Sequence, residues 1–201
     1  AREASRTIVR CGSEWFKNLG SDESGGSKIF SVSGHVQQPG NYEITLGTTF
    51  RELLSLAGGL FEGRTLKAVI PGGSSMPVMP AEAILDCKMD YDSLQAAGSM
   101  IGSGGVIVMD DTACMVQVLE RIAYFYFIES CGQCTPCREG TPRMVNYIDQ
   151  LSSNFGDSRH TEELRQLAYT INQASLCGLG QAAGNPIISA LELFPDLFEI
   201  R

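Results

Sequence analysis

The chain has 201 residues, enough for one large domain or two small ones, and 43% hydrophobic against 19% charged residues is usual for a globular protein. Its formal net charge is −8, and because a negative field repels phosphates, the composition argues against a nucleic-acid partner. No apolar run reaches the roughly 18 residues that a membrane-spanning helix needs, so we expect no direct insertion into a membrane.

Residues 1–27 form an N-terminal segment and linker. The apolar residues scattered through 1–20 predict a helix without a core of its own, and the Gly/Ser-rich run 21–27 predicts a linker. The chain opens with Ala1 and shows no signal-peptide pattern, so we expect its natural N-terminus to lie further upstream.

Residues 28–111 carry the pattern of a small sheet with one helix. Short runs of alternating or continuous apolar residues predict strands near 29–36, 42–46, 68–70 and 106–109. Thr48 or Thr49 is placed to cap a helix, which Gly58 and Gly59 end. Strand, turn, strand and helix followed by further strands predict a β-grasp domain.

Residues 112–201 predict four amphipathic helices, because apolar side chains recur at spacings of three and four. The helices pass through 118–125, 144–151, 164–171 and 187–194. We place Pro142 in the first turn of the second helix, and Asn185 as the cap of the fourth helix with Pro186 after it. The predicted fold class is therefore α+β: a β-grasp domain followed by a four-helix bundle.

Four of the seven cysteines form a pattern. Cys131, Cys134 and Cys137 make a C-x2-C-x2-C run, and Cys177 follows between the third and fourth predicted helices. Three clustered thiolates plus one remote thiolate are a ligand pattern of [4Fe–4S] clusters. The sequence therefore predicts an iron–sulfur centre, carried by the helical domain 112–201.

Two other uses of these cysteines are weaker. Zinc sites usually combine two separated cysteine pairs or cysteine and histidine pairs, and the chain has only two histidines. A disulfide framework is typical of small secreted proteins, which this chain does not resemble. Gly132 lets the backbone approach the sulfur atoms, while Arg138 and the following helix dipole offset the negative charge of a thiolate-bound cluster.

The remaining chemically interesting residues have plainer interpretations. Cys11, Cys87 and Cys114 are isolated, and we expect them to be inert, buried small hydrophobes. His35 falls within a predicted strand and is expected to be a packing or surface residue. The acids at 110–111 are expected to be a solvated helix start. No acid–base or nucleophile set emerges, so no catalytic residue is predicted.

Two glycine patterns superficially resemble nucleotide sites. The pattern from Gly178 to Gly184 follows a helix rather than a strand, so a turn after a cluster ligand is the better interpretation. A second glycine run, 102–105, precedes a strand, which reverses the order that a dinucleotide site requires. The chain thus shows no self-sufficient nucleotide site.

The cysteine motifs and their surroundings closely resemble a known family. The segments ESCGQCTPCREG at 129–140 and LCGLGQAAGNP at 176–186 resemble the NADH-binding flavoprotein subunit (the F subunit in bacteria) of NADH:quinone oxidoreductase, respiratory complex I. Segments 30–43 and 98–111 are similar to the same family, so the resemblance covers nearly the whole chain. Diaphorase subunits of NAD-linked hydrogenases and formate dehydrogenases are related, and the sequence separates these contexts poorly.

The resemblance implies a β-grasp domain of the soluble-ligand-binding type, a [4Fe–4S] cluster on the four patterned cysteines, and FMN close to Gly178 and Leu179. It also implies that FMN and NADH bind to a preceding domain that this chain lacks, so the chain resembles the C-terminal half of the subunit. Electrons would pass from reduced FMN through the cluster to neighbouring iron–sulfur subunits of the NADH dehydrogenase module.

The partners implied are therefore the missing FMN-binding domain and those iron–sulfur subunits. The implied location is cytoplasmic, peripheral to the inner membrane, or on the matrix side in a mitochondrion. The isolated chain is expected to be inactive. A competing hypothesis is a metal-stabilised module that binds a small ligand or a protein, which a reversible redox signal would distinguish from an electron carrier.

Overall fold

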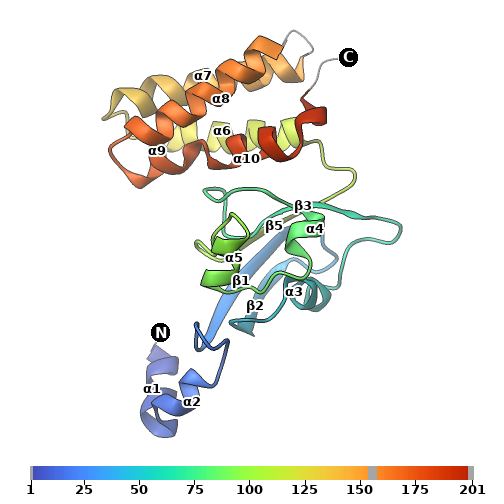
Figure 1. Cartoon of the computed structure of the whole chain (residues 1–201), viewed down its shortest axis with the longest axis vertical. Coiled ribbons are helices and arrows are strands. Elements are labelled where there is room, and N and C mark those ends of the chain that lie inside the picture. The colour runs from blue at the N-terminus through green and yellow to red at the C-terminus, as the bar shows by residue number, and fades with distance from the viewer. Residues whose placement is uncertain (1, 154–157, 199–201) are drawn as a thin grey trace. The chain divides into compact units, whose positions relative to one another are not determined.

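The structure, a computed structural model, describes residues 2–153 and 158–198 (Figure 1). The chain divides into two compact units, residues 1–73 with 80–111 and residues 74–79 with 112–201. The first unit combines a five-stranded mixed sheet with short helices, and the second is built from helices. The predicted α+β class is confirmed.

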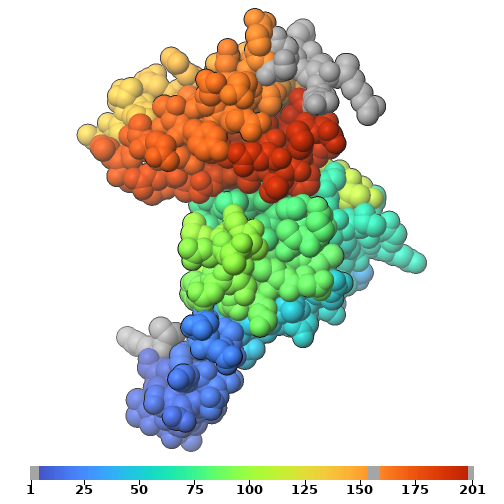
Figure 2. All heavy atoms as spheres, in the orientation of Figure 1, coloured from blue at the N-terminus to red at the C-terminus, as the bar shows by residue number. Residues whose placement is uncertain are grey.

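The N-terminal segment forms two helices, α1 (Arg2–Cys11) and α2 (Ser13–Lys17). Gly12 separates them with φ 87°, a left-handed conformation that glycine adopts without strain. Val9 is 86% exposed and α2 buries no residue, so these helices lack a core of their own, as predicted. Figure 2 shows them as a narrow blue projection at the N-terminal end.

The predicted linker forms a hydrogen-bonded turn instead of a flexible segment. Gly20 and Gly25 pair as an isolated β-bridge, and the next strand begins at Ser27. A side chain at Gly26 would overlap the ring of Phe16, so the helical segment packs directly onto this turn.

The sheet has the order β2-β1-β5-β3-β4. Its strands are β1 (Ser27–Gly34), β2 (Gly40–Thr45), β3 (Leu66–Ile70), β4 (Met79–Pro80) and β5 (Gly105–Asp110). β1 runs antiparallel to β2 and parallel to β5, with Val32 opposite Val106, and β5 runs antiparallel to β3. Alternate residues of β1 and β5, including Phe30, Val32 and Val108, are fully or nearly fully buried in the core.

Helix α3 (Phe50–Leu56) forms where predicted. The Thr49 side chain accepts the backbone N–H of Glu52, and the Glu52 carboxylate accepts the N–H of Thr49 in return, which completes a capping box. Gly58 and Gly59 follow the helix with positive φ. Its buried residues Phe50 and Leu53 belong to the core of this unit.

Three short elements between β3 and β5 were not predicted: β4, α4 (Ala81–Ile84) and α5 (Tyr91–Ala96). None is long enough to show an apolar period, so its sequence pattern is indistinguishable from a loop. A local signal did exist at α5, where the Asp90 side chain accepts the N–H of Ser93 and caps the helix.

Asp110 corrects a sequence-based expectation. It lies in β5 and is 3% exposed, whereas a solvated helix start was predicted. Its Oδ1 is 2.6 Å from Nδ1 of His35, a contact that compensates for burying the carboxyl group. The neighbouring Asp111 is exposed and accepts the backbone N–H of Thr65, so only one acid of the pair faces water.

The helical unit contains α6 (Met115–Glu129), α7 (Thr135–Ser152), α8 (Ser158–Ala174), α9 (Gly178–Ala183), α10 (Asn185–Leu193) and a 3-10 turn (Pro195–Leu197). α7 and α8 lie over α6 and α10 (Figure 1). α7 and α8 approach closely at Gly140, where a Cβ would lie 2.5 Å from the Ile171 side chain, so the contact depends on glycine. Among the described residues, no helix is long and apolar enough to cross a membrane.

Two details of these helices differ from the prediction. α7 begins at Thr135, so Pro136 stands in its first turn and Pro142 lies inside the helix. Pro142 has no N–H, so the carbonyl of Arg138 receives no helical hydrogen bond from that position. The additional helix α9 also makes the unit more than a simple arrangement of four helices.

The prediction that Asn185 caps α10 is wrong, because its side chain forms no capping hydrogen bond. Its side chain instead accepts a hydrogen bond from Asn172 Nδ2 at 2.8 Å and donates one to the carbonyl of Ser75 at 2.9 Å. The Asn172 Oδ1 accepts the N–H of Gly184 at 2.8 Å. These bonds connect α8, the start of α10 and segment 74–79, which belong to the same unit.

Candidate metal centre

The first cysteine segment lies at the junction between α6 and α7. Gly132 adopts φ 73°, which reverses the chain after Cys131 without steric strain. Cys134 is the N-cap of α7, and Cys137 lies in the first turn with only 5% of its surface exposed. Cys131 is exposed and Cys134 is half-buried, so this segment runs from the surface into the core.

Cys177 lies in the second segment, between α8 and α9. Ser175 follows the end of α8, with its N–H bonded to the carbonyl of Ile171, and Cys177 is the N-cap of α9. Cys134 and Cys177 thus both stand at helix N-termini, where the partial positive charge of the N–H groups favours a thiolate.

The two segments meet at Cys134. A hydrogen bond from the backbone N–H of Leu176 lowers the pKa of the Cys134 thiol, and burial opposes this shift. The N–H of Cys137 and the Ser175 hydroxyl act in the same direction as Leu176. Because a thiolate is the form that binds metal, this environment prepares Cys134 for ligation.

Gly180 allows α9 to pack against the first segment. A Cβ at this position would lie 2.3 Å from Oγ of Ser175 and 3.3 Å from Cβ of Cys137. Only a residue without a side chain fits there. Gly180 therefore lets the segment that carries Cys177 pack onto the buried Cys137.

The Arg138 side chain contacts the loop before α7 and the neighbouring Glu139. Its Nη1 donates to the carbonyl of Gly132 at 3.0 Å, and its Nε donates to the carboxylate of Glu139 at 3.1 Å. The guanidinium therefore holds the loop that carries Cys131, while its expected effect on the charge of a bound cluster stays a prediction.

The four thiols do not converge on one point. Within residues 2–153 and 158–198, no three side chains of His, Cys, Asp or Glu are arranged closely enough to hold a metal ion. Sγ of Cys137 lies 3.2 Å from Oγ of Ser130. The structure thus brings together the two predicted ligand segments, while the ligand set itself stays a prediction. A donor set of thiols at helix N-termini, one with a lowered pKa, suits an iron–sulfur cluster.

The other cysteines lie outside this site. Cys11 and Cys114 are exposed and Cys87 is half-buried, so the expectation that all three are buried is wrong. Burial, followed by the nearby negative charge of Asp90, raises the pKa of Cys87, which makes its thiol less reactive.

Sequence reasoning missed Ser130, Ser175 and Gly180. The one signal available was position, because each serine lies one or two residues before a predicted ligand. Gly178, predicted to lie near FMN, opens α9, and a Cβ there would meet no atom within 4 Å. The adjacent Leu179 is half-buried.

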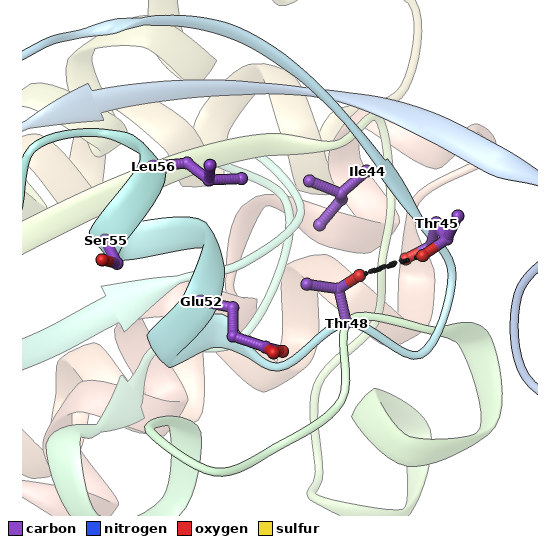
Figure 3. A pocket seen from close by; sticks show the side chains of 6 residues that line it. All are labelled: Ile44, Thr45, Thr48, Glu52, Ser55 and Leu56. Carbon is purple, nitrogen blue, oxygen red and sulfur yellow. Dashed lines mark hydrogen bonds between the residues drawn. The ribbon is translucent and has the colours of Figure 1, made fainter.

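A separate hollow lies on the sheet unit, between the end of β2 and α3 (Figure 3). It is shallow, has a volume of about 500 Å³, and is lined by Ile44, Thr45, Thr48, Glu52, Ser55 and Leu56. The Glu52 carboxylate is already engaged by Thr49 at 2.8 Å, so its capacity to bind a ligand is reduced.

Comparison with known families agrees with both units. Residues 117–201 match the family model described as the NADH-ubiquinone oxidoreductase-F iron-sulfur binding region, and residues 28–108 match the SLBB domain. The helical unit is therefore an iron–sulfur-binding region, which confirms the predicted [4Fe–4S] cofactor class.

Individual relatives give the same result. The chain is 46% identical over 188 residues to a NADH-quinone oxidoreductase F subunit of Rhizobium meliloti (strain 1021), covering 93% of this chain and 44% of the relative. It is 42% identical to the NADH-quinone oxidoreductase F subunit of Streptomyces coelicolor, covering 96% and 42%. An NAD+-reducing [NiFe]-hydrogenase in the H2-reduced state matches with a TM-score of 0.86 and 31% identity, covering 98% of this chain and 33% of that one.

The chain is thus homologous, over nearly its whole length, to part of the F subunits of NADH-quinone oxidoreductases, as its motifs predicted. It spans less than half the length of these curated relatives.

Proposed function

We propose that this chain is an electron-relay region of an NADH:quinone oxidoreductase subunit, in which a [4Fe–4S] cluster accepts electrons from reduced FMN. The observation that carries the proposal is the meeting of the two cysteine segments, where a Cβ on Gly180 would lie 3.3 Å from Cβ of Cys137 and Leu176 lies beside Cys134. Two cysteine segments far apart in the sequence lie side by side, as expected if their thiols bind the same metal centre.

The proposed ligands are Cys131, Cys134, Cys137 and Cys177. When bound, the cluster supplies one-electron redox chemistry. The chain supplies thiolates at two helix N-termini, N–H groups that stabilise them, and a surface through which electrons enter and leave. Cys131 and Cys177 are exposed, which keeps this end of the unit accessible to partners.

FMN and NADH are proposed to bind to a domain outside this chain, on the side where α9 begins. Exposed Gly178 leaves open space beside the ligand Cys177, and a flavin ring needs such space to approach closely. The partners of the working subunit would then be that flavin domain and neighbouring iron–sulfur subunits, in a complex peripheral to the inner membrane on its cytoplasmic or matrix side.

The finer fold description is likewise a proposal. A five-stranded sheet with the capped helix α3 after its second strand suits a β-grasp domain at 28–111, preceded by the segment 1–27, and helices α6, α7, α8 and α10 suit a four-helix bundle within 112–201. The match to the SLBB domain over 28–108 supports the first part.

A diaphorase subunit of an NAD-linked hydrogenase or a formate dehydrogenase is the second candidate. The likeness to the NAD+-reducing hydrogenase supports it, because the same region occurs there. A metal-stabilised binding module is the third candidate, and the hollow between β2 and α3 is what supports it.

Anaerobic iron and sulfide analysis tests the proposal. Protein purified without oxygen should contain about four iron and four acid-labile sulfide per chain and show a reversible signal on reduction with dithionite. Stoichiometric zinc without sulfide would overturn the electron-relay proposal and favour the binding module. The same sample should contain no flavin and show no NADH–ferricyanide activity, because no glycine-rich phosphate-binding turn follows a strand in the sequence.

A further inference from the structure

Two serine hydroxyls lie beside two of the proposed ligands. Oγ of Ser130 lies 3.2 Å from Sγ of Cys137, the most buried of the four cysteines. The Ser175 hydroxyl is buried without a hydrogen-bond partner of standard geometry, and it interacts with the Cys134 thiol. Neither serine has a role in the function proposed above.

Ser175 is held rigidly. Its N–H bonds to the carbonyl of Ile171 at 3.1 Å, and its carbonyl accepts Nε2 of Gln181 at 3.0 Å. Gly180 packs against its side chain so closely that a Cβ there would lie 2.3 Å from the hydroxyl oxygen. A hydroxyl fixed in this way, without a partner of standard geometry, is available to the neighbouring Cys134 sulfur.

Ser130 has its donor free for sulfur. Its Oγ accepts the N–H of Gly132 at 3.4 Å, so the oxygen's acceptor role is used by the backbone. With a thiol at Cys137 either atom can donate, but a metal-bound thiolate carries no proton. In the ligated state the serine hydroxyl must therefore be the donor to sulfur.

We propose that Ser130 and Ser175 are positioning residues that donate hydrogen bonds to the ligand sulfurs of Cys137 and Cys134 and thereby raise the reduction potential of the centre. The proposal rests on the electron-relay function. One-electron reduction adds a negative charge to the cluster and its thiolates, so hydrogen-bond donors at those sulfurs stabilise the reduced state more than the oxidised state. No atom is transferred, and the electron comes from the reductant in the experiment.

The test is a potentiometric titration followed by electron paramagnetic resonance on the whole chain, prepared anaerobically with iron and sulfide. Ser130→Ala and Ser175→Ala should each bind the wild-type amount of iron and sulfide while their potentials shift to more negative values. The double variant should shift further. Each tenfold change in the one-electron equilibrium constant corresponds to about 59 mV.

Two controls separate tuning from structural damage. Ser130→Thr keeps the hydroxyl and should restore the wild-type potential, while Ser152→Ala removes an exposed hydroxyl at the far end of α7 and should change nothing. If Ser175→Ala binds no iron, the comparison of Ser130→Ala with Ser130→Thr still tests whether a serine hydroxyl raises the potential.

The outcomes for the two proposals are distinct. A wild-type chain without a redox-active iron signal would overturn the electron-relay function and this inference with it. A normal wild-type signal whose potential is unchanged in Ser130→Ala, and in Ser175→Ala where that variant retains iron, would overturn this inference alone.

Discussion

At the scale of single residues, the candidate site depends on small groups beside the cysteines. The N–H of Leu176 and the buried Ser175 hydroxyl both act on Cys134, and Gly180 has no side chain because Ser175 and Cys137 occupy that space. The cysteines supply the ligands, whereas these neighbours determine whether the two segments can pack together.

Replacement of single cysteines should separate ligands from bystanders. Changing Cys131, Cys134, Cys137 or Cys177 to serine should lower the iron content or alter the spectrum of the centre, because three thiolates leave one iron without its ligand. The same change at Cys11, Cys87 or Cys114 should leave both unaltered. Iron analysis and electron paramagnetic resonance measure the effect, and a normal centre in Cys177→Ser would show that the fourth ligand is misassigned.

The paired variants Gly180→Ala and Gly178→Ala test the packing of α9. The first adds a methyl group 2.3 Å from the Ser175 oxygen, and such overpacking costs about 1–3 kcal/mol in a folded protein. We expect a lower melting temperature and less bound iron. The second adds a methyl group where no atom lies within 4 Å, so its iron content should equal wild type. Equal behaviour of the two variants would contradict the proposed close contact.

At the scale of elements, helix ends account for much of the architecture. Cys134 and Cys177 begin α7 and α9, so the same backbone N–H groups that start each helix are available to the thiolates. Helix α3 begins instead with a complete capping box, which gives the sheet unit a well-defined helix start.

Thr49→Ala should destabilise the sheet unit by about 0.5–2 kcal/mol, because it removes the side chain that accepts the Glu52 N–H. Thr48→Ala, which removes an exposed bond to the Thr45 carbonyl, is the matched control and should cost less. Chemical denaturation of both variants measures the difference.

The contribution of Glu52 to this cap should depend on pH. Hydrogen bonds from the Thr49 backbone and side chain lower the pKa of Glu52. A lowered folded-state pKa means that the contribution is present above the ordinary pKa of glutamate and is lost as pH falls through the lowered value. If the difference between wild type and Thr49→Ala did not shrink in acid, the reciprocal bond would have no energetic role.

At the scale of the whole molecule, the two units should differ in their dependence on metal. The sheet unit closes a core of its own around Phe30, Phe50 and Leu53, none of which involves a cysteine ligand. In the helical unit, a bound cluster would tie the loop before α7 to the loop after α8, and metal binding of this kind contributes folding free energy.

Hydrogen exchange on holo and apo protein tests this difference. Removal of the cluster should increase exchange within residues 129–185 and leave residues 28–111 protected. Equal loss of protection in both units, or no loss in either, would refute the idea.

The sequence alone determined the features that depend on local pattern. Runs of apolar and alternating residues predicted β1 and β2, and a threonine and a glycine pair predicted the two ends of α3. The cysteine spacing predicted the iron–sulfur class that the family comparison confirms. These succeed because a strand period, a helix cap and a ligand spacing are each written within a few neighbouring residues.

Only the tertiary structure decided the features that depend on distant partners. Buried Asp110 is paired with His35, which directly follows β1, and the side chain of Asn185 bonds to Asn172 and Ser75 instead of capping its own helix. The meeting of Ser175 with the cysteine segment also requires α8 and α9 to be in place. Nothing local specifies these contacts, because each depends on which remote groups packing brings within hydrogen-bonding distance.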